Sequence, residues 1–395
     1  MDSRGFQEID LGDLCIKIGS GVTPRGGGNV YKQDGISLIR SQNIYDYSFE
    51  YKGLVYIDEE QAKKMKNVEV MPDDVLLNIT GDSVARCCIV PNGVLPARVN
   101  QHVSIIRPNS DLVDPRYLLY WINNSITKEL LLSLASTGAT RKALTKGMIE
   151  KLKLSIPPII EQKFVASTLS CLDDKIKINN RINENLEEMA QAIFKSWFVN
   201  FDPFQEGEFE DSELGRIPKG WRVVELGEFF PVITGKKNAN VSSEIGKYPF
   251  FSCSQDVAWT DDYSFEGNAI LVAGNGDFNV KWYKGKFEAY QRTYVLIPYN
   301  ERLTGLLFAA IKFSLDKITS GHRGSVIKFI TKGSIENFKI AMPSKVEDFE
   351  IVSTFETLNN KIEFNNNQIR TLTDIRDSLL PKLMSGEILV PIEEL

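Results

Sequence analysis

The sequence lacks the residue patterns on which disulfide-rich, zinc-binding and membrane-spanning proteins depend. Its five cysteines are odd in number and include no C-x-x-C pair, which indicates reduced thiols. The two histidines, His102 and His322, have no neighbours at metal-ligand spacing, and we expect His102 to pack at a strand edge. No apolar run reaches about 18 residues and no signal peptide follows Met1, so we expect a cytoplasmic protein without membrane contact.

Catalytic and nucleotide-binding motifs are missing as well. The segment from Gly227 to Lys236 has the wrong spacing for a phosphate-binding loop, and Lys237 stands where that loop needs Ser or Thr. Asp202-Pro203-Phe204 lacks the second proline of an amino-methyltransferase signature, and we interpret it as the end of a helix. We therefore expect a chain that has no catalytic site and binds no metal or cofactor itself.

What the sequence does contain is one long helical pattern that occurs twice. From about Ile159 to Trp197, seam residues follow one another in alternating steps of four and three, as in a coiled coil. The same seam recurs at an offset of 186, from Ile351 to Leu383, without a gap. A seam that narrow needs a partner helix, so we expect the two helices to pack as an antiparallel coiled coil.

Each seam carries an asparagine at its midpoint, Asn179 in the first and Asn365 in the second. Equivalent residues of an antiparallel pair meet only at its pseudo-twofold axis, which passes through the midpoint. We therefore predict that Asn179 and Asn365 form a hydrogen bond that sets the register of the helices. In the alternative interpretation, both asparagines are solvated positions at the flank of the seam.

The repeat extends beyond the helices. Leu11-Gly12 matches Leu226-Gly227, and Thr145-Lys146-Gly147 matches Thr331-Lys332-Gly333. The chain is therefore a tandem duplication of a globular half followed by a helix, with pseudo-twofold symmetry. We divide it into a first globular domain, a first long helix with its linker, a second globular domain and a second long helix: residues 1–158, 159–205, 206–343 and 344–395.

Both globular halves are predicted to be rich in β-strands, which makes the fold class α+β. One helix is expected from Pro115 to about Leu134, and its counterpart from about Asn300 to Lys317. Short apolar runs separated by Gly, Pro, Asn and Asp predict the strands. These runs are Ser37–Ile44, Leu54–Ile57, Val75–Thr80, Cys87–Pro91, His102–Pro108, Tyr248–Phe251, Ala269–Ala273 and Thr293–Pro298.

Charge is distributed unevenly between these parts. The net charge is −6, yet residues 1–158 carry 19 Lys and Arg against 18 Asp and Glu, whereas residues 344–395 carry 5 against 10. The acidity is concentrated in the helical segments, which suits the docking of other proteins. The globular halves can still present basic faces to a nucleic acid.

Loops rich in hydrogen-bond donors occur at matched positions of the two halves. Arg and Asn recognise guanine and adenine edges, while Lys and backbone amides suit phosphates. For each residue alone an ordinary solvated surface is the favoured interpretation, but the occurrence of such loops at matched positions in both halves strengthens the case for DNA binding. The candidate DNA-binding residues are Arg25, Asn29, Arg141 and Lys142 in the first half, and Lys236, Lys237, His322, Arg323 and Lys328 in the second.

The chain resembles the specificity subunit of type I restriction–modification systems over nearly its full length. Three segments carry the resemblance in addition to the duplicated plan: Ile217-Pro218-Lys219-Gly220-Trp221 leading to Leu226-Gly227, Ser196-Trp197-Phe198-Val199-Asn200-Phe201-Asp202-Pro203, and Leu379-Leu380-Pro381-Lys382-Leu383-Met384-Ser385-Gly386-Glu387-Ile388. The globular halves of that family diverge too much to transfer any binding residue. The candidate DNA contacts therefore rest on local chemistry alone.

The resemblance implies two target-recognition domains held apart by the helix pair, each recognising one half of a split DNA site. It also implies two methylation subunits that bring S-adenosylmethionine, and restriction subunits that bring ATP and Mg²⁺. The leading hypothesis is thus a non-catalytic DNA-specificity subunit. A protein-interaction scaffold without DNA is the alternative, and a stand-alone methyltransferase or nuclease comes third.

Overall fold

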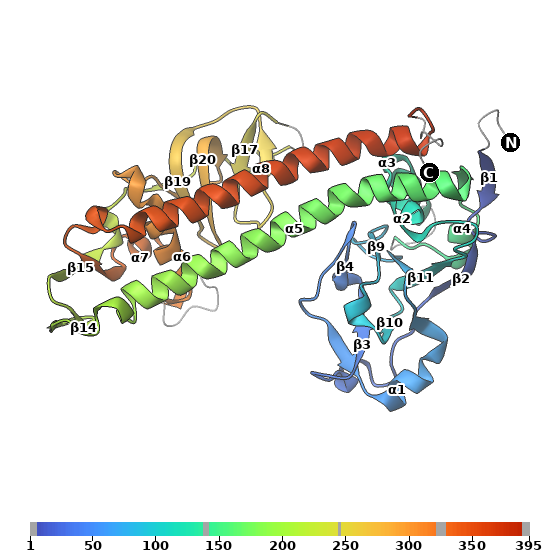
Figure 1. Cartoon of the computed structure of the whole chain (residues 1–395), viewed down its shortest axis with the longest axis horizontal. Coiled ribbons are helices and arrows are strands. Elements are labelled where there is room, and N and C mark those ends of the chain that lie inside the picture. The colour runs from blue at the N-terminus through green and yellow to red at the C-terminus, as the bar shows by residue number, and fades with distance from the viewer. Residues whose placement is uncertain (1–5, 137–141, 244–245, 321–328, 389–395) are drawn as a thin grey trace. The chain divides into compact units, whose positions relative to one another are not determined.

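The computed structural model describes residues 6–136, 142–243, 246–320 and 329–388, and it divides into two compact units (Figure 1). Unit 1 combines Met1–Lys177 with Ile369–Leu395, and unit 2 comprises Ile178–Gln368. Each unit contains one globular domain, part of the first long helix and part of the second. The class is α+β, with two tandem repeats, as the sequence predicts.

The domain of unit 1 is a mixture of short strands and short helices. Its strands are β1 (Gln7–Asp10), β2 (Cys15–Ser20), β3 (Ile36–Ile39), β4 (Ile44–Tyr45), β5 (Ser48–Phe49), β6 (Val55–Ile57), β7 (Glu69–Val70), β8 (Val75–Asn78), β9 (Cys87–Ile89), β10 (Ala97–Val99), β11 (Val103–Pro108) and β12 (Lys153–Ile156). Its helices are α1 (Glu59–Lys64), α2 (Pro115–Asn123), α3 (Ser125–Ser136) and α4 (Lys146–Glu150).

Two four-stranded sheets form the centre of this domain, in the orders β2-β11-β8-β9 and β6-β3-β10-β7. Strand β8 shows how the layers stack. Val75 and Leu77 lie in the core cluster that contains the helices, whereas Leu76 lies in the cluster that contains the second sheet. Successive side chains of a strand point to opposite faces. The first sheet is therefore buried between the helices and the second sheet.

The domain of unit 2 is built around a single six-stranded sheet with the order β16-β21-β19-β20-β17-β18. Its strands are β13 (Phe209–Ser212), β14 (Gly215–Pro218), β15 (Trp221–Glu225), β16 (Val232–Thr234), β17 (Tyr248–Phe251), β18 (Ala258–Thr260), β19 (Phe265–Ala273), β20 (Val280–Ala289), β21 (Thr293–Leu296) and β22 (Lys339–Pro343). Its helices are α6 (Thr304–Ser320) and α7 (Lys332–Glu336).

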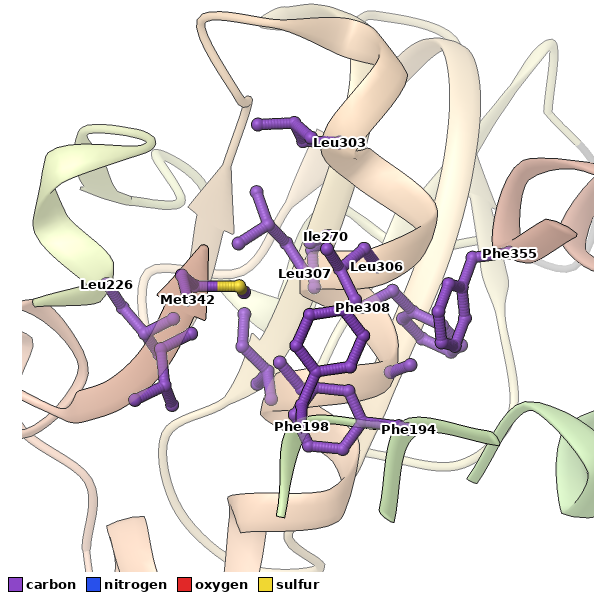
Figure 2. Close-up of a cluster of buried hydrophobic side chains, with 14 of the residues drawn as sticks. Phe194, Phe198, Leu226, Ile270, Leu303, Leu306, Leu307, Phe308, Met342 and Phe355 are labelled. Carbon is purple, nitrogen blue, oxygen red and sulfur yellow. The ribbon is translucent and has the colours of Figure 1, made fainter. Parts of the chain in front are cut away.

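The core of unit 2 forms where this sheet, its main helix and the long helices meet (Figure 2). Leu306 and Leu307 of α6 pack with Ile270 of β19, and Phe194 and Phe355 belong to the same buried cluster. Several aromatic rings take part in the cluster, and each ring buries a large apolar area. Burial of these side chains is the main force that holds the domain against the helices.

Several details of the globular domains differ from the sequence-based expectation. The strand expected over Ser37–Ile44 ends at Ile39, because a short 3-10 turn at Ser41–Asn43 follows it. The helix expected from Pro115 to Leu134 is broken at Asn124, whose backbone is extended and whose Oδ1 accepts from the amide of Ile126 (3.0 Å). Asparagine in this position caps a new helix. Strand β20 is absent from the prediction, because the polar and glycine residues 284–286 interrupt its apolar pattern.

The repeated sequence motifs mark the same structural junction in both units. The amide of Leu11 donates to the carbonyl of Leu152 (2.8 Å), and the amide of Leu226 donates to that of Phe338 (3.0 Å). The glycine that follows each leucine lies against the last residue of α4 or α7, where an added Cβ would come within 3.2 Å or 3.1 Å of that helix. The motif is thus a docking point of the first strand on a short helix.

The long helices are α5 (Ile159–Phe198), with 40 residues, and α8 (Ile351–Met384), with 34. In unit 1, Asp173 of α5 bonds to Arg376 of α8 (2.8 Å), and Val165 shares a cluster with Leu383. As the residue number increases along α5, the residue number of its contact in α8 decreases. In unit 2 the later part of α5 meets the earlier part of α8 in the same way, so both pairings are antiparallel.

The seam asparagines are buried, with Asn179 1% and Asn365 2% exposed. The bond expected between their two amides is replaced by bonds to other residues. Nδ2 of Asn179 donates to Gln368 (3.2 Å), Nδ2 of Asn365 donates to Asn183 (2.8 Å), and Asn183 in turn donates to Asn366 (2.8 Å). The expected partner is corrected because the register places Asn179 opposite the turn of α8 that follows Asn365.

Among the described residues, no helix combines the length and the apolarity that crossing a membrane would need.

Candidate nucleic-acid interface

Three segments of the first domain meet at one polar cleft. They are the segment from Ser41 to Tyr45, which contains the turn after β3 and strand β4, the loop between β8 and β9, and His102, which precedes β11. The cleft has a volume of about 480 Å³, and its lining residues are Ser41, Gln42, Tyr45, Thr80, Gly81, Asp82, Ser83, Arg86 and His102. This lining offers both donors and acceptors, which suits base edges and phosphates.

Hydrogen bonds to the backbone hold these segments together. Nδ2 of Asn78, at the end of β8, donates to the carbonyl of Ser41 (2.9 Å). The amide of Ile79 donates to the carbonyl of His102 (3.0 Å). The loop that follows turns back sharply through Ala85, which has a φ of 71° and is fully buried. The cleft is therefore built on backbone positions that the two sheets fix.

The side chains of the cleft hold one another in place. Nδ1 of His102 lies 2.6 Å from Oγ1 of Thr80, and its Nε2 lies 2.9 Å from Nε2 of Gln101. The guanidinium of Arg86 lies over the ring of Tyr45, 4.6 Å from its centroid. A guanidinium that stacks on a ring keeps its N–H edge for hydrogen bonding. Arg86 is therefore suited to bind a guanine edge or a phosphate.

The second domain repeats the backbone framework of these loops. The amide of Gly274 donates to the carbonyl of Arg292 (2.9 Å), as the amide of Ile79 donates to that of His102. The amide of Ile330, which precedes α7, donates to the carbonyl of Gly274 (2.9 Å). In the first domain the corresponding amide is that of Leu144, which precedes α4 and donates to the carbonyl of Ile79 (2.8 Å). The loops that follow β8 and β19 are therefore structurally equivalent.

A second pair of backbone bonds aligns the turns that follow β3 and β17. The amide of Asn100 donates to the carbonyl of the last residue of β3 (3.0 Å), and the amide of Tyr290 donates to that of Phe251, which ends β17 (2.9 Å). Ser41 and Cys253 each lie two residues beyond these acceptors. A side-chain amide also holds the second turn, as it holds the first, because Nδ2 of Asn279 donates to the carbonyl of Cys253 (3.1 Å).

At these equivalent positions the side chains differ in chemistry. Cys253 stands where the first domain has Ser41, and Arg292 stands where it has His102. Arg292 is exposed, whereas the imidazole at the other position is half-buried. Two domains with one framework and different side chains can recognise two different sequences.

The corresponding loops of the second domain, around Cys253 and Arg292, carry two cations. Burial lowers the pKa of Lys281, whose Nζ donates to the carbonyl of Ser254. Nε2 of Gln255 donates to Oδ2 of Asp277 (2.7 Å), which orients that amide at the surface. Together, Lys281 and the exposed Arg292 provide positive charge that suits a phosphate backbone.

The first predicted pair of loops starts at equivalent positions of the two domains, and in the second domain it contacts the residue before Arg292, because the amide of Gln291 donates to the carbonyl of Lys237 (3.0 Å). Arg25 and Asn29 are exposed, and the carbonyl of Arg25 accepts from Gln61 (3.2 Å). Lys236 is exposed and lies 5.1 Å from the ring centroid of Phe265, and Lys237 is half-buried. These side chains remain candidate contacts by their charge and their hydrogen-bonding groups.

The structure also aligns these two loops with each other. The amide of Gly21 donates to Val103 (2.8 Å), and the amide of Gly235 donates to Thr293 (2.9 Å). Because the two glycines are equivalent, Lys236 and Lys237 correspond to residues 22 and 23. Arg25 therefore lies two positions beyond the counterpart of Lys237.

The second predicted pair of loops is described only in part. Lys142 is exposed, and its carbonyl accepts from the amide of Gly81 (3.2 Å), which places it beside the cleft. The other predicted contacts lie outside the described residues: Arg141, His322, Arg323 and Lys328.

Sequence reasoning misses most of the cleft residues. It assigns His102 to packing at a strand edge, whereas the imidazole lines the cleft. It does not single out Gln42, Asp82 or Arg86, because polar residues between strands are common. The available signal is the alignment of the two halves, which sets Gln101-His102 against Gln291-Arg292 immediately before a strand.

Within the ranges that the structure describes, no group of three or more His, Cys, Asp or Glu side chains is arranged to hold a metal ion.

Comparison with known proteins places this arrangement in a class. The family model described as "Type I restriction modification DNA specificity domain" matches residues 3–188 and again residues 218–374. The chain therefore belongs to the family of type I restriction–modification specificity subunits, with two copies of the family domain. The leading hypothesis is confirmed at this level, and the scaffold without DNA is not favoured.

Two relatives and one solved structure illustrate the similarity. The chain is 27% identical to the type I restriction enzyme MjaIX specificity subunit of Methanocaldococcus jannaschii over 428 aligned residues, which cover 98% of this chain and 96% of the relative. It is 38% identical to the EcoDI specificity subunit of Escherichia coli over 178 residues, 44% of this chain and 40% of that relative. The type I S subunit structure from M. genitalium has a TM-score of 0.59, 15% identity and 97% coverage of both chains, which shows a shared fold.

Proposed function

We propose that each globular domain of this specificity subunit recognises one half of a split, asymmetric DNA site. One observation carries the proposal: a common framework of loop bonds recurs in both domains with different side chains on it. The shared framework suits one mode of docking, and the different side chains suit two different half-sites. A scaffold that binds only proteins gives no reason for such paired polar clusters.

We assign the contacts by their chemistry. Arg86 and Gln42 in the first domain and Arg292 in the second are suited to base edges, because guanidinium and amide groups bond bidentately there. The cations on the predicted loops are suited to phosphates. These are Lys142, Lys236, Lys237 and Arg25, and the assignment as DNA contacts extends to Asn29 and to the predicted residues outside the described ranges, Arg141, His322, Arg323 and Lys328.

The helices α5 and α8 have two roles in this proposal. They set the unread spacer between the half-sites, and they dock the methylation subunits through their acidic surfaces. The buried amides of Asn179 and Asn365 set the register of the pair, because an unpaired amide in the seam would be costly. The division into residues 1–158, 159–205, 206–343 and 344–395 follows these roles.

The chemistry of modification and cleavage belongs to other subunits in this proposal. Two methylation subunits supply S-adenosylmethionine, and restriction subunits supply ATP and Mg²⁺. This chain acts in the cytoplasm as a non-catalytic subunit that binds double-stranded DNA and no cofactor. Its partners carry the reactive groups, and it determines where they act.

The test is to express the chain with its neighbouring methylation subunit in a methylation-free host and to sequence the genome with modification-sensitive reads. We expect a split, asymmetric motif methylated on both strands, with two half-sites and one fixed spacer. A host that expresses the methylation subunit alone is the control and should show no motif. If the complex assembles and still methylates nothing, the proposed recognition function is wrong.

A further inference from the structure

A small hairpin connects the cleft of the first domain to the long helices of unit 1. Strands β4 and β5 pair through Tyr45 and Ser48, and Asp46 and Tyr47 form the turn between them. Tyr45 lines the cleft and supports the guanidinium of Arg86. The position of this hairpin therefore decides where Arg86 is presented.

The turn residue Tyr47 has a backbone conformation that needs support from its surroundings. Its φ is 62°, in the left-handed region that a bulky residue seldom adopts. Its amide donates to the carbonyl of Cys87 (3.0 Å), and its hydroxyl donates to the carbonyl of Asn123 (3.4 Å). The preceding Asp46 accepts from the amide of Cys87 (3.2 Å) and pairs with Lys128.

The ring of Tyr47 is covered by an arginine from the far end of the chain. The guanidinium of Arg376, in α8, lies 4.1 Å from the ring centroid of Tyr47. Nη1 of Arg376 donates to Oδ1 of Asp173 in α5 (2.8 Å). The other carboxylate oxygen of Asp173 accepts from the hydroxyl of Tyr120 (2.5 Å). The ring centroids of Tyr120 and Tyr47 are 5.8 Å apart.

These contacts fix the guanidinium from several sides. The side chain of Arg376 is 12% exposed and that of Asp173 is 19% exposed, so water screens their attraction less than at an open surface. A second carboxylate, from the more exposed Asp377, bonds to the same guanidinium (2.8 Å). With its N–H groups held by carboxylates, the cation has one flat face against Tyr47.

The second repeat carries different residues at the corresponding positions. At the offset of 186 that relates the helices, Ala190 stands where Arg376 would fall and Asn359 stands where Asp173 would fall. The equivalent junction of unit 2 is an aromatic cluster that includes Phe194, Phe198 and Phe355. The arginine contact is therefore specific to the first domain and is not a general feature of the repeat.

We propose that Arg376 is a positioning residue for DNA recognition by the first domain: it holds Tyr47, and through the hairpin it fixes Tyr45 and Arg86 at the cleft. This inference rests on the proposed function, since it needs the cleft to contact DNA. Arg376 and Tyr47 are far apart in the sequence, so the consequence is not evident from the sequence alone. A residue in the C-terminal helix controls selectivity for the half-site that the N-terminal domain recognises.

The experiment uses the full chain in complex with its methylation subunits. Methylation rates are measured on the cognate duplex and on duplexes with one substituted base pair in either half-site. The variants are Arg376→Ala, Arg376→Lys and Tyr47→Leu. Lys361→Ala is the matched control, because it removes a cation of the same helix that also lies over an aromatic ring (Phe364, 4.8 Å) but belongs to unit 2.

We expect Arg376→Ala and Tyr47→Leu to reduce the preference for the cognate first half-site by about tenfold, the loss of one good base contact. The preference at the second half-site should be unchanged, and Arg376→Lys, which retains the cation over the ring, should restore part of the selectivity. Lys361→Ala should behave as the unaltered chain. This asymmetry separates positioning from general support of the helix pair.

An equal loss of selectivity at both half-sites, or no loss at either, would overturn the inference. If Arg376→Ala fails to assemble, Tyr47→Leu decides the question, because it leaves the bond between Arg376 and Asp173 intact. Failure of the proposed function is distinguished by the unaltered complex, which would then show no preference for a split site at all.

Discussion

Single side chains differ between the two repeats at equivalent backbone positions of the loops. His102 and Arg292 occupy the same place before a central strand, and Ser41 and Cys253 occupy the same place after another. Because hydrogen bonds to the backbone form the framework, these side chains can change without loss of the loop geometry. Under the proposed function, these side chains determine which bases are preferred, and the backbone framework determines where the side chains meet the DNA.

Arg292→Ala tests this at one position. The variant should weaken duplex binding by about 1–3 kcal/mol and relax the preference at one base pair of the second half-site. Binding is measured as a function of salt concentration for the complex with its methylation subunits. If Arg292 contacts only a phosphate, all sequences will weaken equally and the salt slope will fall by about one.

Arg302→Ala is the matched control for this measurement. Arg302 is exposed in the same unit but lies outside the loop cluster, so its removal should leave the preference unchanged. A relaxed preference in the control would contradict the assignment of Arg292.

The seam residues show what a sequence can and cannot determine at this scale. The heptad pattern places Asn179 and Asn365 inside the helix pair, and both are buried. It does not determine their partners, since a small shift along the helix exchanges one amide for another. The bonds to Gln368 and Asn183 depend on how the two helices pack together, which cannot be predicted from the heptad pattern of either helix alone.

At the scale of elements, the sequence predicts those whose pattern is local. The long helices begin at Ile159 and Ile351, where their seams predict, and β17 spans Tyr248–Phe251 as expected. Strand β20 could not be predicted in the same way. Its residues from Val280 to Phe287 pair with β19. This pairing with a neighbouring strand stabilises β20 and does not require alternating apolar residues.

One small element, the loop that follows β2 in the first domain and β16 in the second, depends on a glycine. At Gly21 an added Cβ would overlap the carbonyl oxygens of Val99 and Asn100, and at Gly235 it would overlap that of Tyr290. A side chain at either position can be accommodated only if the backbone shifts. The clash is with the main chain, so no side-chain rotation can relieve it.

Gly21→Ala should therefore destabilise unit 1 by about 3 kcal/mol, and Gly235→Ala should do the same to unit 2. Amide hydrogen exchange resolves the two units and measures each loss separately. Gly93→Ala is the control, because nothing lies within 4 Å of its added Cβ. Equal exchange in all three variants would show that the close approach at Gly21 and Gly235 does not govern stability.

At the scale of the whole molecule, the repeat is recognisable in the sequence, whereas the cleft is not. The repeat shows itself in matched motifs such as Leu11-Gly12 and Leu226-Gly227, which recur in the same order. The cleft assembles residues from three separate segments, and these residues share no spacing. They become a site only when the sheets bring them together.

The spacer role of the helices is tested by changing their length. Inserting one heptad at the middle of α5 and one at the middle of α8 adds about 10 Å, since each residue adds about 1.5 Å. Because base pairs stack about 3.4 Å apart, the unread spacer should grow by about three base pairs with both half-sites unchanged. Modification-sensitive sequencing reports half-sites and spacer together.

The same heptad inserted after Glu206, an exposed residue of the linker, is the control and should leave the spacer unchanged. Altered half-sites in the helix variant would argue against a ruler, since they would place sequence recognition in the helices.

The division of the chain into two units has a consequence for its synthesis. Unit 1 needs the segment that begins at Ile369, which leaves the ribosome about 190 residues after Lys177. At about 5–20 residues per second, the first domain waits roughly 10–40 s for the helix segment that covers it. During that interval the apolar seam of α5 is available to chaperones and to other nascent chains. The domain that is translated first is therefore the one that is completed last.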